Sequence, residues 1–366
     1  MEEAMRKLTR TDVGDILLAA TILGTGGGGS LEEGMKMMDE VFARNKDIIL
    51  ANYDEIPEDA MIGTPYYCGA ISPLTKEEKA KYNGLPVMDE NMCVAAARSM
   101  EKYAGKKFAG FNSTEFGGGN TAVAMYVAAM AGVPVMNCDA AGRAVPDLQL
   151  STYNLNGVSI APLAVANAFG DQAVFTSLVN DFRAEEMVRA LAVVSRNTIG
   201  VIDHINTAGV LKNAVILGAM DNLLEVGEAW RTAEKNGVKR IEACVKKGNG
   251  RIAYYGTVKE QPYSTVNGYT VGDTYITTDN GEELHLWYRN ENIVMWKNGN
   301  VDCTAPDLIC ILDADTGMPI CNPNLEPGER VAVLLFPCDK MWKSEKGLSL
   351  LGPRAFGFDI DPVFAF

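Results

Sequence analysis

The first half of the chain alternates between short apolar runs and longer stretches in which apolar residues recur at helical spacing. The clearest unit covers residues 107–136. It has an apolar run at 107–111, a helix of small residues at 121–131 that Gly132 ends, and a second apolar run at 133–136. A strand, a helix and a strand in this order form a pair of parallel strands. We therefore predict an α/β N-terminal domain with a partly parallel sheet.

A run of glycines lies between two predicted helices near the N-terminus. Residues 11–23 have helical spacing with Thr11 as N-cap, and Ser30 with Glu33 forms a capping box for the next helix. Between them, residues 24–29 read GTGGGG. Glycines allow a ligand to approach the backbone, and the helix after Ser30 offers N–H groups to an anion. The alternative is a tight helix–helix turn packed against another part of the backbone.

The second half of the chain changes character. Residues 184–197 and 214–235 predict helices, and from Arg251 onward short alternating runs are separated by Gly, Asn and Asp turns. We therefore predict a C-terminal domain with a β-rich module that is smaller than the N-terminal domain. The predicted boundaries are residues 1–170 for the N-terminal α/β domain and 171–366 for the C-terminal domain, with a helical part at 180–237, a β-rich module at about 250–340 and an apolar tail that docks back.

The bulk composition is typical of a globular protein, with 47% hydrophobic and 22% charged residues among 366. A net charge of −14 argues against nucleic acid or an anionic membrane as the main partner, because both bind basic surfaces. The 8 cysteines are scattered without a CxxC pair, and no apolar leader is visible, so we expect a cytoplasmic protein. No apolar run is long enough for a transmembrane helix. We expect a small-molecule substrate. The net charge of the chain does not decide between a monomer and a homo-oligomer.

Three carboxylates follow predicted strands: Glu115 after the first run of the central unit, and Asp139 and Asp147 after the second. In open α/β sheets the carboxyl ends of the strands line the ligand crevice. Two carboxylates in one crevice push their pKa values apart, so that one serves as acid and the other as base. The same groups could hold a divalent metal such as zinc, with Asp139 and His204 among its ligands.

Other residues of the same loops are candidates for substrate binding. Arg143 has the planar fork that binds a carboxylate. The remaining candidates are loop residues of the two glycine segments, namely Gly26, Gly27, Gly28, Gly118 and Asn120. In the structural alternative, Asp139 or Asp147 caps a turn and Arg143 pairs internally. No nucleotide is expected, because neither a GK[ST] ending nor a glycine fingerprint after a strand is present.

Two further side chains are open to a functional or a structural interpretation. Cys68 stands at the end of a predicted strand, where a nucleophile could lie, but a buried inert thiol is the commoner case. His204 could be a ligand or an acid–base group, but a single histidine on an apolar strand is more often structural. The chain has only one other histidine, which argues against a site with three histidine ligands. Turn chemistry explains the polar pairs Asn290-Glu291 and Pro306-Asp307.

Six segments carry a family resemblance. They are LGTGGGG (23–29), EFGGGN (115–120), CDAAGRAVPDLQL (138–150), RNEN (289–292), APDLI (305–309) and GPRAFGF (352–358). Together they resemble the S-methyl thiohydantoin desulfurase-like family, whose genes often accompany those of the hydantoinase/oxoprolinase group. The resemblance spans nearly the whole chain and implies the same two-domain fold. It also implies hydrolysis at a ring carbon of a thiohydantoin-like substrate with release of a thiol, and a metal-assisted reaction in some form.

The chain departs from the family pattern at two places near the expected crevice. The family often has an Ala-Pro-type turn where this chain has residues 68–73, and it often has glutamate at the position of Asp147. Two hypotheses follow. The first is a hydrolase of a small thiohydantoin- or hydantoin-like cyclic amide, in which Glu115, Asp139 and Asp147 activate water. The second is a non-catalytic small-molecule-binding or partner subunit of a hydantoinase-like system.

Overall fold

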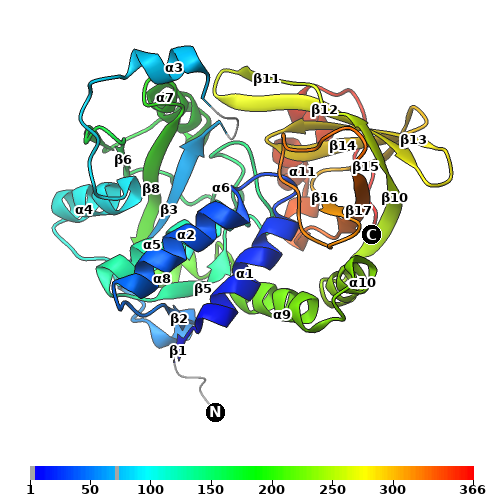
Figure 1. Ribbon diagram of the computed structural model, residues 1–366. Coiled ribbons are helices and arrows are strands. Elements are labelled where there is room, and N and C mark those ends of the chain that lie inside the picture. Colours follow the sequence, from blue (N-terminus) through cyan, green and yellow to red (C-terminus); the bar gives the residue numbers. More distant parts are fainter. Residues whose placement is uncertain (1–4, 71–73) are drawn as a thin grey trace.

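The computed structural model describes residues 5–70 and 74–366, which form two domains (Figure 1). Residues 71–73, part of the turn that departs from the family pattern, lie outside the described residues. The first domain is built on a mixed sheet with helices packed against it, and the second on an antiparallel sheet. The α/β and β-rich domains expected from the sequence are therefore confirmed.

The first sheet runs in the order β1-β2-β5-β4-β3-β8-β6-β7, with β9 beside β5. Its strands are β1 (Arg6–Lys7), β2 (Ile49–Ala51), β3 (Met61–Gly69), β4 (Gly110–Ser113), β5 (Val135–Asp139), β6 (Leu163–Ala166), β7 (Gln172–Phe175), β8 (Thr198–Thr207) and β9 (Ile216–Leu217). The strands β2, β5, β4 and β3 are parallel, and β8 pairs antiparallel with β3. The loops after β3, β4 and β5 therefore meet at one edge of the sheet.

The second sheet is antiparallel in the order β15-β14-β13-β12-β10-β17-β16, with β11 beside β12. Its strands are β10 (Arg251–Glu260), β11 (Tyr263–Val266), β12 (Tyr269–Thr278), β13 (Glu283–Arg289), β14 (Glu291–Lys297), β15 (Asn300–Thr304), β16 (Leu308–Asp313) and β17 (Arg330–Phe336). The outer strands β14 and β15 also contact β16, so the sheet curls on itself.

Most helices lie around the first sheet, whereas α10 packs against β10 of the second sheet (Figure 1). They are α1 (Arg10–Leu23), α2 (Leu31–Ala43), α3 (Lys76–Lys81), α4 (Met92–Ala104), α5 (Gly118–Ala131), α6 (Thr152–Leu155), α7 (Asp181–Val193), α8 (Ala208–Leu211), α9 (Ala219–Thr232), α10 (Gly237–Lys247) and α11 (Glu345–Leu351), with short 3₁₀ helices at Tyr53–Glu55, Lys340–Lys343 and Pro353–Phe356. In the described part of the chain, no helix has the length and apolarity needed to cross a membrane.

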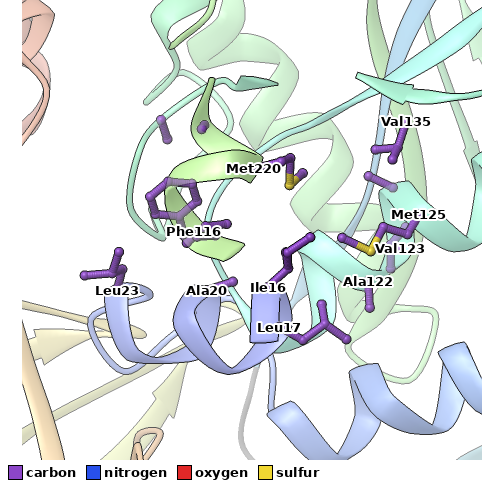
Figure 2. Close-up of a cluster of buried hydrophobic side chains, with 14 of the residues drawn as sticks. Ile16, Leu17, Ala20, Leu23, Phe116, Ala122, Val123, Met125, Val135 and Met220 are labelled. Carbon is purple, nitrogen blue, oxygen red and sulfur yellow. The ribbon is translucent and has the colours of Figure 1, made fainter. Parts of the chain in front are cut away.

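The core of the first domain forms where α1, α5 and α9 pack together. Figure 2 shows Ile16 and Leu17 of α1 in one buried cluster with Ala122 of α5 and Met220 of α9. The helix α5 consists largely of small residues and is buried on nearly all sides, which allows close packing. A second close approach joins α2 to α5, where a Cβ on Gly34 would lie 2.0 Å from the carbonyl oxygen of Gly118.

Several helix boundaries differ from the sequence-based expectations. The N-cap of α1 is Thr9, whose side chain accepts from the backbone N–H of Asp12, and not Thr11. The helix α5 begins at Gly118, so that Gly118 and Asn120 lie in its first turn. The single helix expected at 214–235 is a short strand followed by α9, because Gly218 has a φ of +74° and interrupts it.

Candidate active site

A cavity of about 730 Å³ lies at the carboxyl edge of the parallel strands, and both domains line it. The first domain contributes the glycine loop at residues 26–29, the end of β3 at 66–70, and the loops after β4 and β5. The β domain contributes residues around Glu291 and Asn322. Of the residues expected at the site, Gly26, Gly27, Gly28, Glu115, Asn120, Asp147 and His204 line this cavity. Asp139, Arg143 and Gly118 do not.

The glycine loop is held by its carbonyl groups between the two domains. The carbonyl of Thr25 accepts from the N–H of Asn292 at 2.8 Å, and that of Gly26 accepts from Asn322 at 2.9 Å. The carbonyl of Gly28 accepts from Gly119 and Asn120 in the first turn of α5, at 3.1 and 2.9 Å. These contacts require the left-handed φ values of +94° at Gly26 and +73° at Gly28. The loop thus packs closely on other backbone, as the structural alternative expected, and also lines the cavity.

Glu115 lies directly after β4 and is fixed at both carboxylate oxygens. Its Oε1 accepts from Nδ2 of Asn120 at 2.6 Å, and its Oε2 accepts from the backbone N–H of Val145 at 2.7 Å. Asn120 is in turn held by the backbone N–H of Tyr67 at 2.9 Å. Burial raises the pKa of Glu115 to about 7, although these two donors oppose the rise. A carboxylate with this pKa changes protonation near neutral pH.

A second buried carboxylate, Glu291 at the start of β14, lies in the same cavity. Its side chain is 2% exposed, and its Oε2 has no hydrogen-bond partner in the described structure. Burial, and then the charge of Glu115, raise the pKa of Glu291 well above its ordinary value. Sequence reasoning assigned this residue to a turn. The signal that could have identified it is the RNEN motif, which places one acidic side chain between two amides at a strand start.

Asp147 lines the cavity but is already engaged by the β domain. Its two oxygens accept from the hydroxyl of Tyr269 and from the guanidinium of Arg289. Oε1 of Glu185 lies 2.8 Å from the same Tyr269 hydroxyl, so the two carboxylates share its single proton, and Arg289 lies over the Tyr269 ring. Asp147 therefore joins the loop after β5 to the β domain, and its negative charge is balanced by Arg289.

The expected roles of Asp139 and Arg143 do not fit their positions. Asp139 is fully buried outside the cavity, and its Oδ1 accepts from the N–H groups of Ala141 and Gly142 at 2.9 and 2.6 Å. It caps a turn, as the structural alternative held. Burial raises the pKa of Asp139 to about 6. Gly118 is likewise structural, because a Cβ there would lie 2.5 Å from the backbone nitrogen of Leu31.

Arg143 is fully buried and binds only protein atoms. Its five N–H groups donate to the carbonyl oxygens of Ala144, Pro306, Asp307 and Asn292 and to the hydroxyl of Thr25, at 3.0 to 3.2 Å. A guanidinium has five donors, so none is left for a substrate carboxylate. Arg143 therefore fastens the glycine loop and the β domain to each other.

Asp203 and His204 both reach the cavity although they are neighbours on β8. Adjacent residues of a strand normally face opposite sides. Here the pairing with β3 shifts between Ile62 and Thr64, and His204 has a φ of +46°. Such a bulge redirects a side chain.

The histidine is held in a fixed orientation. Its Nδ1 lies 2.8 Å from Oδ1 of Asp203, whose Oδ2 accepts from the hydroxyl of Tyr66 at 2.6 Å. The ring stacks on Tyr153 with 4.3 Å between centroids, and Nε2 lies 3.8 Å from Asp181. Burial opposes protonation, but Asp203 and Asp181 raise the pKa of His204 to about 9. His204 is thus a cation at neutral pH, paired to Asp203.

The expected metal ligands do not come together. Across residues 5–70 and 74–366, no group of three or more His, Cys, Asp or Glu side chains is arranged to hold a metal ion. His204 lines the cavity, and Asp139 does not. Cys68 does line the cavity, but burial raises its pKa to about 12, which disfavours a nucleophilic thiolate.

Comparisons with known proteins agree with this architecture. The S-Me-THD-like N-terminal domain matches residues 11–177, and the S-Me-THD-like C-terminal domain matches residues 179–364. The fold is similar to that in a crystal structure of a protein from Chromobacterium violaceum, with a TM-score of 0.77 and 20% sequence identity over 98% of this chain and 99% of that one. A comparison with curated proteins finds no match.

Proposed function

Because the chain belongs to the S-Me-THD-like family, we propose that it is a hydrolase that acts on a small thiohydantoin-like cyclic amide and releases a thiol. The family description supports a thiohydantoin-related role. The cavity of about 730 Å³ is of a size that accommodates a small ring with a substituent. A hydrolase also needs groups that move protons, and the cavity provides two.

The observation that carries the proposal is the pair of buried carboxylates, Glu115 and Glu291. Both line the cavity, and the charge of each disfavours the charge of the other. Glu115 accepts N–H donors at both oxygens, which favours its ionised form. Glu291 has an unpartnered oxygen in a buried position, which favours its protonated form. The two environments therefore assign Glu115 as general base and Glu291 as general acid.

The reaction proceeds in two steps with these groups. In the first, Glu115 takes a proton from water as the oxygen attacks the ring carbon that bears the sulfur, and Glu291 donates its proton to the adjacent ring nitrogen. In the second, the carbon–sulfur bond breaks, and the sulfur takes the proton held by Glu115. The new hydroxyl returns its proton to Glu291 and becomes a carbonyl. The products are a hydantoin-like ring and a thiol, and both carboxyl groups regain their starting states.

Thiol release from an S-methyl thiohydantoin ring tests this proposal directly. Glu115→Gln and Glu291→Gln are each expected to lower kcat by about 100-fold or more, the usual contribution of general acid–base groups. The matched control is Glu234→Gln, which removes an exposed carboxylate between α9 and α10. It is expected to retain wild-type activity.

The outcomes separate the two hypotheses. Full activity in both cavity variants would contradict the assigned acid–base roles. Binding of the ring by the wild type without any turnover would instead indicate a non-catalytic small-molecule-binding subunit.

A further inference from the structure

Asn290 lines the cavity next to Glu291. It is the single residue between β13 and β14, and it is buried, with 5% exposure. Neighbouring residues of a strand normally face opposite sides. Asn290 has a left-handed φ of +57°, which interrupts this alternation, so Asn290 and Glu291 both line the same cavity.

The protein binds every hydrogen-bonding group of Asn290 except one. Its N–H donates to the carbonyl of Thr270 at 2.7 Å, and its Oδ1 accepts from the N–H of the same residue at 2.9 Å. Its carbonyl accepts from Nδ2 of Asn322 at 2.9 Å. Only the oxygen of an amide accepts from a backbone N–H, so these contacts fix the orientation of the side chain. Among the described residues Nδ2 has no hydrogen-bond partner, and it is not one of the buried atoms closed off from solvent. Its N–H groups are therefore available to a ligand in the cavity.

The local structure does not require this amide nitrogen. A left-handed φ is favoured by glycine, asparagine and aspartate, and the N–H of Thr270 needs only an oxygen as its acceptor. Aspartate would meet both requirements. What asparagine adds is the Nδ2 donor, which is held rigidly beside the proposed general acid. Cavities that bind small molecules use a few fixed polar groups of this kind to orient the ligand.

We propose that Nδ2 of Asn290 binds the carbonyl oxygen of the ring, and that the cavity thereby selects rings with a carbonyl next to the nitrogen that Glu291 protonates. The inference rests on the proposed function, because it names the ring feature that the same site recognises. Asn290 and Glu291 are consecutive residues, and the carbonyl carbon and the nitrogen are consecutive ring atoms. Both contacts therefore form on one edge of the ring, and the carbonyl contact turns the nitrogen toward Glu291. A ring without this carbonyl would leave the Nδ2 donor buried without a partner.

A carbonyl oxygen is a neutral acceptor, so its binding does not depend on the net charge of the cavity. The charge of Arg143 acts on both Glu115 and Glu291, but its N–H groups all bind protein atoms. Nε2 of His204 is another nitrogen of the lining without a hydrogen-bond partner. It lies 3.8 Å from a carboxylate oxygen of Asp181. His204 is thus the competing donor for the ring carbonyl, and the experiment includes a variant of it.

Calorimetric binding of two uncharged rings tests this role: hydantoin, and imidazolidin-2-one, which has a methylene group in place of the carbonyl that Asn290 would bind. We expect the wild type to bind hydantoin about fivefold or more tightly than imidazolidin-2-one, the usual effect of one hydrogen bond. Asn290→Asp keeps the acceptor for Thr270 and tolerates the left-handed φ, but it places an oxygen where the donor was. This change is expected to remove or reverse the preference. Asn290→Gly, which also adopts this φ, is expected to remove it.

The matched control is Asn324→Asp, because Asn324 also lines the cavity and the change adds the same charge to it. It is expected to keep the wild-type preference, and so is His204→Gln. Thermal unfolding shows whether each variant is folded. The inference would be overturned if the wild type bound the two rings equally or bound neither, or if both Asn290 variants kept the preference. A preference that is lost in His204→Gln and kept in Asn290→Asp would overturn it too, because His204 would then be the donor.

Thiol release from an S-methyl thiohydantoin, measured with the wild type, distinguishes this inference from the proposed function. If no thiol is released but the preference for hydantoin is present and is lost in Asn290→Asp, the proposed hydrolase is wrong and the binding of the carbonyl by Asn290 stands. If thiol is released but the Asn290 variants keep the wild-type preference, the hydrolase stands and the role of Asn290 is wrong.

Discussion

A Cβ on Gly27 would lie 1.8 Å from Oε1 of Glu291, so the side chain of Glu291 occupies the space that any other residue at position 27 would fill. The absence of a side chain at Gly27 therefore makes room for the carboxyl group that we propose as the general acid. Gly27 does not have one of the left-handed φ values that occur at Gly26 and Gly28. Alanine is thus compatible with the backbone at this position, and its clash is with the side chain of Glu291.

Gly27→Ala is expected to lower kcat by about 10- to 100-fold while the protein remains folded, because displacement of Glu291 removes acid catalysis. Kinetics and thermal unfolding measure the two effects. Gly14→Ala in α1 is the control, since a Cβ there contacts nothing within 4 Å. In a Glu291→Gln background, the Gly27→Ala change should lower kcat much less than it does in the wild type. If the change lowers kcat by the same factor in both backgrounds, Gly27 does not act through Glu291.

The rate should depend on the protonation of Glu115. The pKa of Glu115 is about 7, and a general base must be ionised to act. The value of kcat/KM should therefore rise as pH increases from 5 to 8, with its midpoint at about 7. Thiol release measured across this range gives the profile. Glu234→Gln should reproduce the wild-type midpoint. A rate that is constant from pH 5 to 8 would exclude Glu115 as the essential base.

Arg143 should matter for stability, since all five of its N–H groups bind protein atoms. Arg143→Lys keeps the charge but loses most of the five hydrogen bonds, and we expect unfolding free energy to fall by about 3 kcal/mol or more. Denaturant unfolding measures the loss. Arg183→Lys is the control, because Arg183 is exposed and its ion pair is with the exposed Glu186, and it should change stability by less than about 0.5 kcal/mol. An Arg143→Lys protein of wild-type stability with a raised KM would restore the substrate-binding interpretation.

Stability should fall on the alkaline side because of His204. Its pKa is about 9 in the folded protein against 6.5 for an ordinary histidine, so the folded state binds the proton more tightly. The stabilisation is complete below pH 6.5 and is lost as pH rises through about 9, with a total of about 3 kcal/mol. Unfolding free energy measured from pH 6 to 10 should show this loss. His204→Gln should remove the loss, whereas His285→Gln should keep it.

Much of the fold could be predicted because its signals are local. The glycine at position 132 ends α5 with a φ of +74°, and Ser30 with Glu33 caps α2. The helix α10 could not be predicted in the same way. Gly237 closely follows the helix predicted at 214–235, and it is the first residue of α10, which the side chain of Asn236 caps. A glycine next to one helix can also begin another, and the choice depends on tertiary packing.

The sequence predicted the site residues that follow strands of the first sheet. It did not predict the roles of residues that depend on contacts with the second domain. Glu115 and Asp147 follow parallel strands, and the carboxyl ends of such strands meet. Glu291 and Arg143 take their roles from the docking of the β domain on the glycine loop. That docking brings together residues more than 100 positions apart. No local pattern in the sequence encodes it.

The burial of Arg143 also limits how the molecule can move. A hinge opening between the domains would separate the guanidinium from Asn292, Pro306 and Asp307 or from Thr25, and would leave a charge and several carbonyl groups without partners. The hydrogen bonds of Arg143 therefore oppose a hinge opening between the two domains. A ligand would then reach the cavity through local displacement of side chains or loops at its mouth, without separation of the glycine loop from the β domain.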